Sequence, residues 1–310
     1  MSTLLEQDLR ACADLARRHY ENFAVGSLLL PRRLRLPLAA IYAALRIADD
    51  LVDEPSPGVE PRHALAEWER GLGAAAEGRS APHYAQRACG AVIREFGLSL
   101  DPFHALFRAF RRDTVQQRYE TFEELLEYCR DSANPVGRLV LQLFGVRDSE
   151  RFHASDQICT GLQLVNHWQD VASDARRGRI YLPAQDLDRF AVDSEGLLRG
   201  QDSPELRALL AFETGRARRL LEQGGALVAA TRGRLRLEVA LFRRAGLVAC
   251  DALARAGYAV QQGAPHLGPR QRWSIALGGL HDALRARLRP VESRVGDHGE
   301  LPRPEAPHGA

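Results

Sequence analysis

The sequence contains no lysine and only one methionine among its 310 residues. All 42 basic residues are therefore arginine, which reflects biased codon usage as much as chemistry. The formal net charge is only +2, and basic tracts and basic patches interleaved with aromatic residues are both missing. Nucleic acid is therefore excluded as a partner, because such binding needs a concentrated basic surface.

Cysteine is also scarce. The five cysteines are odd in number, scattered along the chain and never spaced as C-x-x-C, which predicts a reduced, cytoplasmic setting. The histidines, His153 and His167 among them, have no partners at metal-ligand spacing. The G-x-S-x-G, H-E-x-x-H and dinucleotide fingerprints are absent as well, so the sequence offers no known hydrolase, zinc or nucleotide signature.

Long uncharged runs are missing. No stretch of about 20 residues is free of charge, so no transmembrane helix is predicted. Glu6 and Asp8 precede any apolar run, and no signal peptide is visible. We expect a cytoplasmic protein that is either soluble or peripheral at the inner face of the membrane. Residues 28–36 (LLLPRRLRL) leave two interpretations open, contact with a bilayer surface or an ordinary helix start at Arg32, of which the second is more frequent.

Strand signals are absent too, and nearly every segment has helical periodicity. The sequence predicts an all-α protein, with a single domain over residues 1–290 and a disordered tail, rich in proline, glycine and histidine, over 291–310. Pro31 and Pro37 are expected to bracket the entry to the second helix, and Pro55 and Pro57 to close it. The other helices are expected at residues 4–23, 62–78, 83–97, 102–118, 121–131, 150–175, 203–230, 234–257 and 270–289.

Residues 42–54 (YAALRIADDLVDE) place four polar groups along one line of an otherwise apolar helix. At about 100° per residue, Tyr42, Arg46, Asp49 and Asp53 fall within about 60° of arc. The carboxylates lie beside the apolar face, where an unpaired charge is costly, so a cation is expected to meet them. Taken alone, this stripe is equally compatible with a solvated helix face.

A second polar stripe favours the cation site over the solvated helix face. In residues 163–174 (QLVNHWQDVASD), Gln163, Asn166, Asp170 and Asp174 fall within about 80° of arc. Carboxylates converging from two helices repel each other unless a hard divalent cation joins them. Ligands that are all oxygen atoms favour Mg²⁺, which keeps part of its water shell and shares its coordination with substrate phosphates. Together the two stripes predict diphosphate chemistry.

Two further segments have open interpretations. Residues 132–137 (SANPVG) interrupt the helical pattern, because Pro135 removes an amide donor and Gly137 permits close backbone approach. They form either a kink facing a ligand, where Asn134 could position water, or a plain junction between helices. Downstream, Arg179 could hold a phosphate, whereas Arg176 and Arg177 are better explained as cations at a helix C-terminus.

With these motifs, the sequence resembles the squalene and phytoene synthase family of head-to-head prenyl synthases, over residues 10–290. The resemblance rests on DDLVDE (49–54), NHWQDVASD (166–174), Tyr128 in YCRDSANPVG, and RGRIYLP (177–183). Within the family, HYENF (19–23), LLLPRRLR (28–35) and SANPVG are most similar to the bacterial hydroxysqualene synthase branch, which serves hopanoid biosynthesis.

The resemblance implies the isoprenoid synthase fold, a helical bundle whose central cavity is lined by two aspartate-rich helices. It implies Mg²⁺ ligands at Asp49, Asp53, Asn166, Asp170 and Asp174. The residues implied to act in catalysis are Tyr42, Arg46, Tyr128, Asp53 and Asp170. The expected substrate contacts are His19, Phe23, Asn134, Gly137, Gln163, Arg179, Tyr181 and Tyr258, of which Asn134 and Gly137 come from the SANPVG segment.

The activity implied is Mg²⁺-dependent conversion of presqualene diphosphate to hydroxysqualene, with release of diphosphate and without NADPH. The alternatives are presqualene diphosphate synthase, squalene synthase and phytoene synthase, the first two of which would take farnesyl diphosphate. SANPVG departs from the small-residue VAGxVG pattern of squalene and phytoene synthases, which puts the condensing half-reaction in doubt. A noncatalytic scaffold relative is the alternative of a different class, and the intact aspartates argue against it.

Overall fold

The computed structural model describes residues 3–18, 30–55, 57–261, 263 and 268–288. These residues form helices joined by turns, without any strand among them, which confirms the predicted all-α class. The first eight helices are α1 (Thr3–Arg18), α3 (Arg32–Asp53), α4 (Pro61–Ala76), α5 (Tyr84–Phe96), α6 (Asp101–Asp113), α7 (Phe122–Ser132), α8 (Asn134–Leu143) and α9 (Ser149–Arg176). They are followed by α10 (Ala184–Arg189), α11 (Ser194–Leu198), α12 (Pro204–Gln223), α13 (Gly225–Ala230), α14 (Gly233–Arg255) and α15 (Pro269–Leu288).

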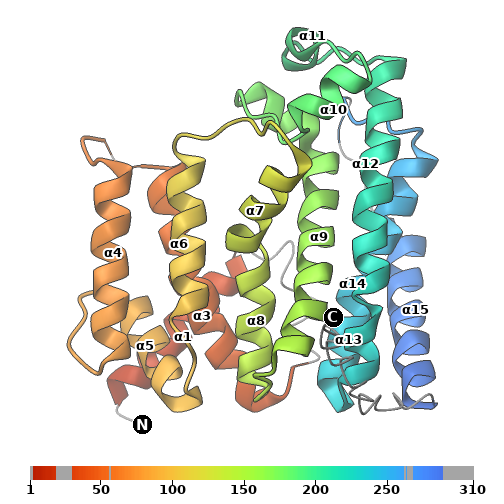
Figure 1. Cartoon of the computed structure of the whole chain (residues 1–310). Coiled ribbons are helices and arrows are strands. Elements are labelled where there is room, and N and C mark those ends of the chain that lie inside the picture. Colours follow the sequence, from red (N-terminus) through yellow and green to blue (C-terminus); the bar gives the residue numbers. More distant parts are fainter. Residues whose placement is uncertain (1–2, 19–29, 56, 262, 264–267, 289–310) are drawn as a thin grey trace, which may run out of the picture.

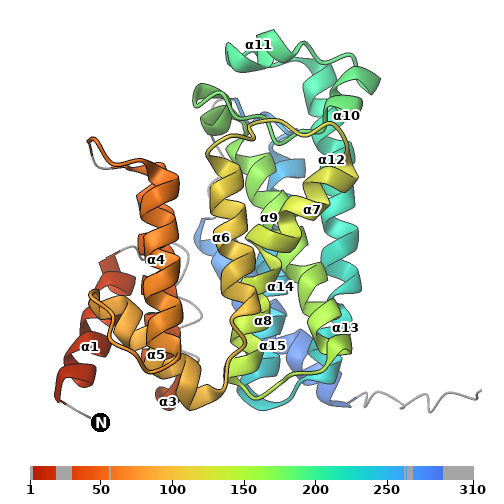
Figure 2. The same cartoon turned by 60° about the vertical axis from the view of Figure 1, so that its left-hand side comes forward.

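The helices form two groups with separate apolar interiors. In Figure 1, α9 stands beside α12 and α14 on one side, while α4 and α5 lie on the other, with α6 to α8 between them. Turning the molecule by 60° shows α1, α4 and α5 as a group beside the main bundle (Figure 2). Leu34 and Leu65 belong to the N-terminal apolar cluster and Trp168 and Leu253 to the other, and Phe144 packs against both. The two helices with aspartate stripes, α3 and α9, therefore belong to different clusters.

Helix α3 begins directly after Pro31, at Arg32, as the helix-start interpretation of residues 28–36 predicts. Leu30 is buried and its carbonyl accepts a hydrogen bond from Arg35 Nε at 3.2 Å, so Leu30 is not exposed to a bilayer, and residues 28 and 29 lie outside the described part. The prediction that Pro37 brackets the helix entry was wrong, because Pro37 lies inside α3. Proline is tolerated at this position near the start of α3, because only the Arg33 carbonyl loses its hydrogen-bond partner within the helix.

Two other expectations needed correction. The helix predicted over residues 203–230 is divided at Gly224 into α12 and α13, because two consecutive glycines have low helix propensity. The short helices α10 and α11 were not predicted, since five or six residues carry too little periodicity to be recognised. The predicted tail over 291–310, and residues 19–23 of the first predicted helix, lie outside the described residues.

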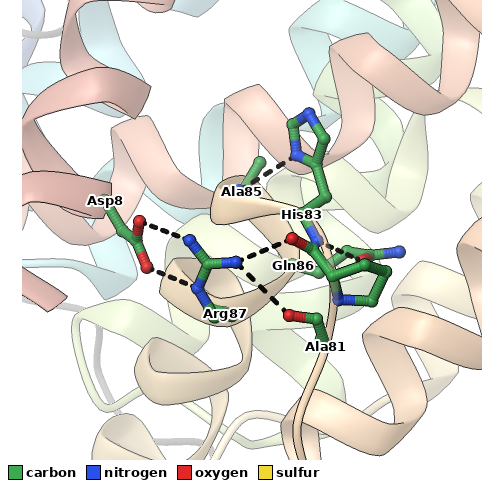
Figure 3. A network of polar contacts seen from close by, with 7 residues as sticks. Asp8, Ala81, His83, Ala85, Gln86 and Arg87 are labelled. Carbon is green, nitrogen blue, oxygen red and sulfur yellow. Dashed lines mark hydrogen bonds and ion pairs between the residues drawn. The ribbon is translucent and has the colours of Figure 1, made fainter. Parts of the chain in front are cut away.

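A partly buried ion pair joins α1 to α5 (Figure 3). Arg87 on α5 donates from Nε and Nη2 to the two carboxylate oxygens of Asp8 on α1, both at 2.8 Å. The Arg87 Nη1 atom also donates to the backbone oxygens of Pro82 at 2.8 Å and Ala81 at 3.3 Å. Because the Asp8 side chain is almost inaccessible, this bidentate pair fixes α1 against α5, and losing Arg87 would leave the Asp8 carboxylate buried without its partner.

The contact between α4 and α5 gives a test of the packing. A Cβ atom at Gly90 would lie 2.5 Å from the backbone carbonyl carbon of Ala75, whereas a Cβ at Gly73 on α4 would meet nothing within 4 Å. We expect Gly90→Ala to lower the free energy of unfolding by about 2 kcal/mol, because two backbones must separate. The matched control, Gly73→Ala, should raise it by about 0.5–1 kcal/mol through helix propensity. Urea unfolding of both variants measures the difference, and equal stabilities would contradict this packing.

Within the described ranges, no helix is both long enough and apolar enough to cross a bilayer.

Candidate active site

Helix α3 brings its polar stripe to the end of a cavity. Tyr42, Arg46 and Asp49 line a cavity of about 340 Å³, called the first cavity below. The Arg46 guanidinium lies 2.6 Å from Asp50 Oδ1 (Nη2) and 3.7 Å from Asp49 Oδ2 (Nη1). Arg46 is thus held mainly by Asp50, a carboxylate just beside the predicted stripe.

Helix α9 presents the second stripe. Gln163 and His167 share a hydrogen bond of 3.2 Å between Nε2 atoms, one turn before Asp170. Asn166 and Asp170 are exposed, whereas Asp174 in the last turn is half-buried. The polar face of α9 therefore changes along the helix. Its middle turns carry the Gln163–His167 hydrogen bond, and its last turns carry the acids.

Arg179 connects the two stripes. Its Nη2 atom lies 3.2 Å from Asp53 Oδ1 at the end of α3, although 126 residues separate them in the chain. Arg179 follows directly after α9, and its positive charge also counters the rise in the pKa of Asp174. Arg179 thus forms an ion pair with Asp53, and its charge also acts on Asp49 of α3 and Asp174 of α9.

The carboxyl groups on both sides hold protons more tightly than usual. Burial raises the pKa of Asp49 to about 6, and the neighbouring charge of Asp53 adds to the rise. Burial likewise raises the pKa of Asp174 to about 6, with Asp170 as the next cause. Carboxylates that are partly buried and repel each other are groups that a cation would stabilise.

Asp113, at the end of α6, is a site residue that sequence reasoning missed. Tyr128 donates from its hydroxyl to Asp113 Oδ2 at 3.1 Å. Burial raises the pKa of Asp113 to about 7, and the charges of Asp53 and Asp49 contribute to the same rise. Its Oδ1 atom is buried and has no hydrogen-bond partner among the described residues. Asp113 is thus hydrogen-bonded to Tyr128 and close enough to the α3 aspartates to interact with their charges.

Aromatic rings surround this carboxyl group. The Tyr181 ring stacks on the His167 imidazole with centroids 3.7 Å apart, and lies 5.9 Å from the Tyr128 ring. Tyr119 completes the group at 5.4 Å from Tyr128 and 5.8 Å from Tyr181. Burial lowers the pKa of His167 to about 3, so its imidazole is neutral at physiological pH. These rings pack on one another in the interior, and His167 and Tyr181 also line a small cavity of about 10 Å³ beside Asp174 and Arg179.

A second cavity of about 240 Å³ adjoins the first. The two share Leu38, Val136 and Val140 as lining residues, so they meet across one wall. The second cavity is lined almost entirely by apolar side chains of α8, α9, α13 and α14, together with Ser155 and Glu238. Glu238 was not expected there. Its position among Leu235, Val239 and Phe242, on one helical face, is the signal that could have revealed it.

The remaining predicted residues are placed differently. Gly137 lines the second cavity, and a Cβ there would collide with the Ser155 and Cys159 side chains, so α8 approaches α9 closely at this point. Asn134 is buried and its Oδ1 accepts a hydrogen bond from Thr160 at 2.8 Å, which ties α8 to α9. Tyr258 follows α14 with a left-handed φ of 59° and packs against the larger apolar cluster.

His19 and Phe23 lie outside the described residues. The substrate contacts assigned to them, and the role of Asn134 in positioning water, stay predictions. Residues 132–137 form the junction between α7 and α8, with Val136 and Gly137 on the cavity side. The segment is therefore a junction between helices that also lines both cavities, and a ligand contact there stays a prediction.

Among the described residues, no three acidic, histidine or cysteine side chains are grouped closely enough to form a complete metal site. This is compatible with Mg²⁺, which is usually bound by one or two carboxylates together with substrate phosphates and water. The donor chemistry also fits, because the aspartates offer only oxygen and their raised pKa values reflect burial and mutual repulsion.

Comparison with known proteins identifies the family. The sequence profile described as squalene/phytoene synthase matches residues 16–271. The chain is 32% identical over 291 residues to phytoene synthase from Thermus thermophilus, covering 94% of this chain and 97% of that protein. It is 34% identical over 232 residues to hydroxysqualene synthase from Sinorhizobium fredii, covering 73% and 77% of the two chains. The crystal structure of squalene synthase HpnC from Alicyclobacillus acidocaldarius aligns with a TM-score of 0.79 and 39% identity, over 83% of this chain and 97% of that one.

Proposed function

The chain belongs to the squalene/phytoene synthase family of prenyl diphosphate enzymes, and we propose that it converts presqualene diphosphate to hydroxysqualene with release of diphosphate. The product is a precursor of squalene and hopanoids. The proposal rests on one observation above all, the pair of adjoining apolar cavities, of which the first is also lined by Arg46 and Asp49. Such a shape suits one molecule with a charged diphosphate head and long apolar chains.

Different residues would act on the diphosphate group and on the hydrocarbon part of the substrate. Arg46 and Arg179 neutralise the diphosphate, and Asp49, Asp53, Asn166, Asp170 and Asp174 are the groups that would hold Mg²⁺. When bound, Mg²⁺ would withdraw charge from the leaving diphosphate oxygen. The carbon–oxygen bond breaks and its electron pair leaves with the diphosphate. The rings of Tyr128 and Tyr181, whose centroids lie 5.9 Å apart, are the groups that would stabilise the resulting cation.

The second half of the reaction needs water. A water oxygen adds to the rearranged cation and loses one proton, which gives the alcohol and balances the charge. The apolar lining of both cavities limits the number of water molecules that reach the cation. Asn134 at the start of α8 is the predicted group for positioning that water, although its side-chain oxygen is already bonded to Thr160.

A condensing enzyme is the second candidate, because the relatives of similar identity include phytoene synthases. Such an enzyme must hold two prenyl diphosphates at once with their reacting carbons in contact. The match to a hydroxysqualene synthase, at 34% identity, supports the first candidate, whereas the 39% identity to the squalene synthase HpnC does not separate the two candidates.

The two candidates differ in the substrate that they consume. We expect the purified protein with Mg²⁺ to form hydroxysqualene rapidly from presqualene diphosphate, and little or no product from farnesyl or a C20 prenyl diphosphate alone. Each incubation is run with and without NADPH, and the products are identified by mass spectrometry. NADPH should not change the product, because water and not hydride ends the reaction.

Three results would overturn this assignment. Efficient formation of presqualene diphosphate from farnesyl diphosphate would assign the first half-reaction instead. Squalene as the main product only in the presence of NADPH would identify a squalene synthase, and a C40 hydrocarbon from the C20 substrate would identify a phytoene synthase. No turnover of any of these substrates would favour a noncatalytic relative.

A further inference from the structure

The last helix, α15, lies at the outer edge of the bundle and packs on α14 through one face (Figure 1). That face is built from small residues, since a Cβ atom at Gly279 would lie 2.6 Å from the Leu241 side chain and one at Gly278 would lie 2.5 Å from Arg244. Asp282 adds an ion pair of 3.5 Å to Arg243 on α14. The inner face of α15 is therefore fully used for packing within the molecule.

The outer face carries large apolar side chains exposed to solvent. The exposed fractions are 67% for Trp273, 61% for Leu277, 46% for Leu280 and 51% for Leu284. On a helix these four fall within about 60° of arc and extend over about 17 Å. We call them the α15 stripe. Single exposed apolar residues are common on protein surfaces, whereas a continuous line of four is typical of a binding surface.

The charges beside the α15 stripe have one sign. Arg270 and Arg287 are exposed, and each lies within about 20° of one edge of the stripe. Arg272 and Arg285 are exposed farther round the helix. Of the residues Pro269–Leu288, only Asp282 is acidic, and it faces α14 in the ion pair with Arg243. An apolar line between rows of arginine matches a partner that is apolar inside and negatively charged at its surface.

We propose that the outer face of α15 binds the surface of a lipid bilayer containing anionic phospholipids. In this arrangement the helix lies parallel to the membrane, Trp273 and the three leucines enter the boundary between headgroups and acyl chains, and the arginines contact phosphates. A second copy of the chain fits less well, because a symmetric dimer through the same face would bring arginine rows against each other. The proposal goes beyond the proposed function and holds for any of the candidate substrates.

The test uses the full-length protein and sedimentation with phosphatidylcholine vesicles, prepared with and without phosphatidylglycerol. We expect binding to the vesicles with phosphatidylglycerol and much weaker binding to those without it. Leu277→Glu should weaken this binding at least about tenfold, because a carboxylate must enter the headgroup region. The double variant Arg270→Gln/Arg287→Gln should weaken binding only to the anionic vesicles.

The matched control is Leu4→Glu, at a leucine that is exposed by 54% on α1, and α1 lies on the opposite side of the molecule from α15 in Figure 1. It should bind vesicles as the unaltered protein does, and circular dichroism should show equal helix content in all variants. Absence of binding by the unaltered protein, or equal losses in Leu4→Glu and Leu277→Glu, would overturn the proposal. So would a dimer, detected by light scattering, that Leu277→Glu dissociates, because a second copy would then cover the α15 stripe.

Discussion

Asp53→Asn and Asp170→Asn should each lower turnover of the diphosphate substrate by about a hundredfold or more while leaving the helix content unchanged. Asp53 is the last residue of α3 and is paired with Arg179, and Asp170 lies in the last two turns of α9. Asparagine keeps the shape of the side chain and removes the charge. The expected loss therefore reports on metal and diphosphate binding rather than on packing. A product assay with Mg²⁺, together with circular dichroism, measures both properties.

A second measurement separates binding from chemistry. Mg²⁺ together with inorganic diphosphate should raise the midpoint of thermal unfolding of the unaltered protein, since a ligand stabilises the state that it binds. Both asparagine variants should lose most of that rise. Asp188→Asn, an exposed aspartate on the short helix α10, is the control and should behave as the unaltered protein in both measurements. Near-normal turnover in both site variants would refute the two-stripe metal site.

Periodicity was sufficient to predict the fold class and most helices, because long amphipathic segments repeat their pattern over several turns. It failed where a helix was too short to show a period, or where a residue was compatible with two positions in a helix. Helices α10 and α11 are too short to show a period, and Pro37 was compatible with either the start or the interior of α3. The break at Gly224 could have been predicted from the two consecutive glycines, but the sequence analysis predicted one continuous helix there.

The candidate site shows the same limit. Stripes on α3 and α9 could be found because their members repeat one turn apart on a single helix. Asp113 could not, since it is a single acid at the end of α6 and becomes part of the site only through Tyr128 on α7. Asp50 was visible in the sequence, yet its contact with Arg46 depends on a side-chain rotamer that periodicity does not specify. Partners on different helices require the tertiary structure.

Glu238 is the clearest case of a polar group that the fold leaves without compensation. It is only 4% exposed, it lines the apolar second cavity, and its Oε1 atom has no hydrogen-bond partner in the described part of the chain. Burial alone raises the pKa of this carboxyl from 4.5 to about 7. Because the folded-state pKa lies above the unfolded value, the folded protein binds this proton more tightly. The contribution of Glu238 to stability is therefore most favourable below pH 4.5 and is lost as the pH rises through 7.

Glu238→Gln should remove that loss, because glutamine keeps the size of the side chain and cannot ionise. At pH 8 we expect the variant to exceed the unaltered protein in free energy of unfolding by about 1–3 kcal/mol, and at pH 5 by much less. Urea unfolding of both proteins at the two pH values measures the difference. Glu95→Gln, an exposed glutamate on α5, is the control and should change stability equally at both pH values. If Glu238→Gln changed the free energy of unfolding equally at pH 5 and pH 8, the Glu238 carboxyl would have to be solvated or paired when ionised. The second cavity could then not be the dry, apolar end of the substrate site.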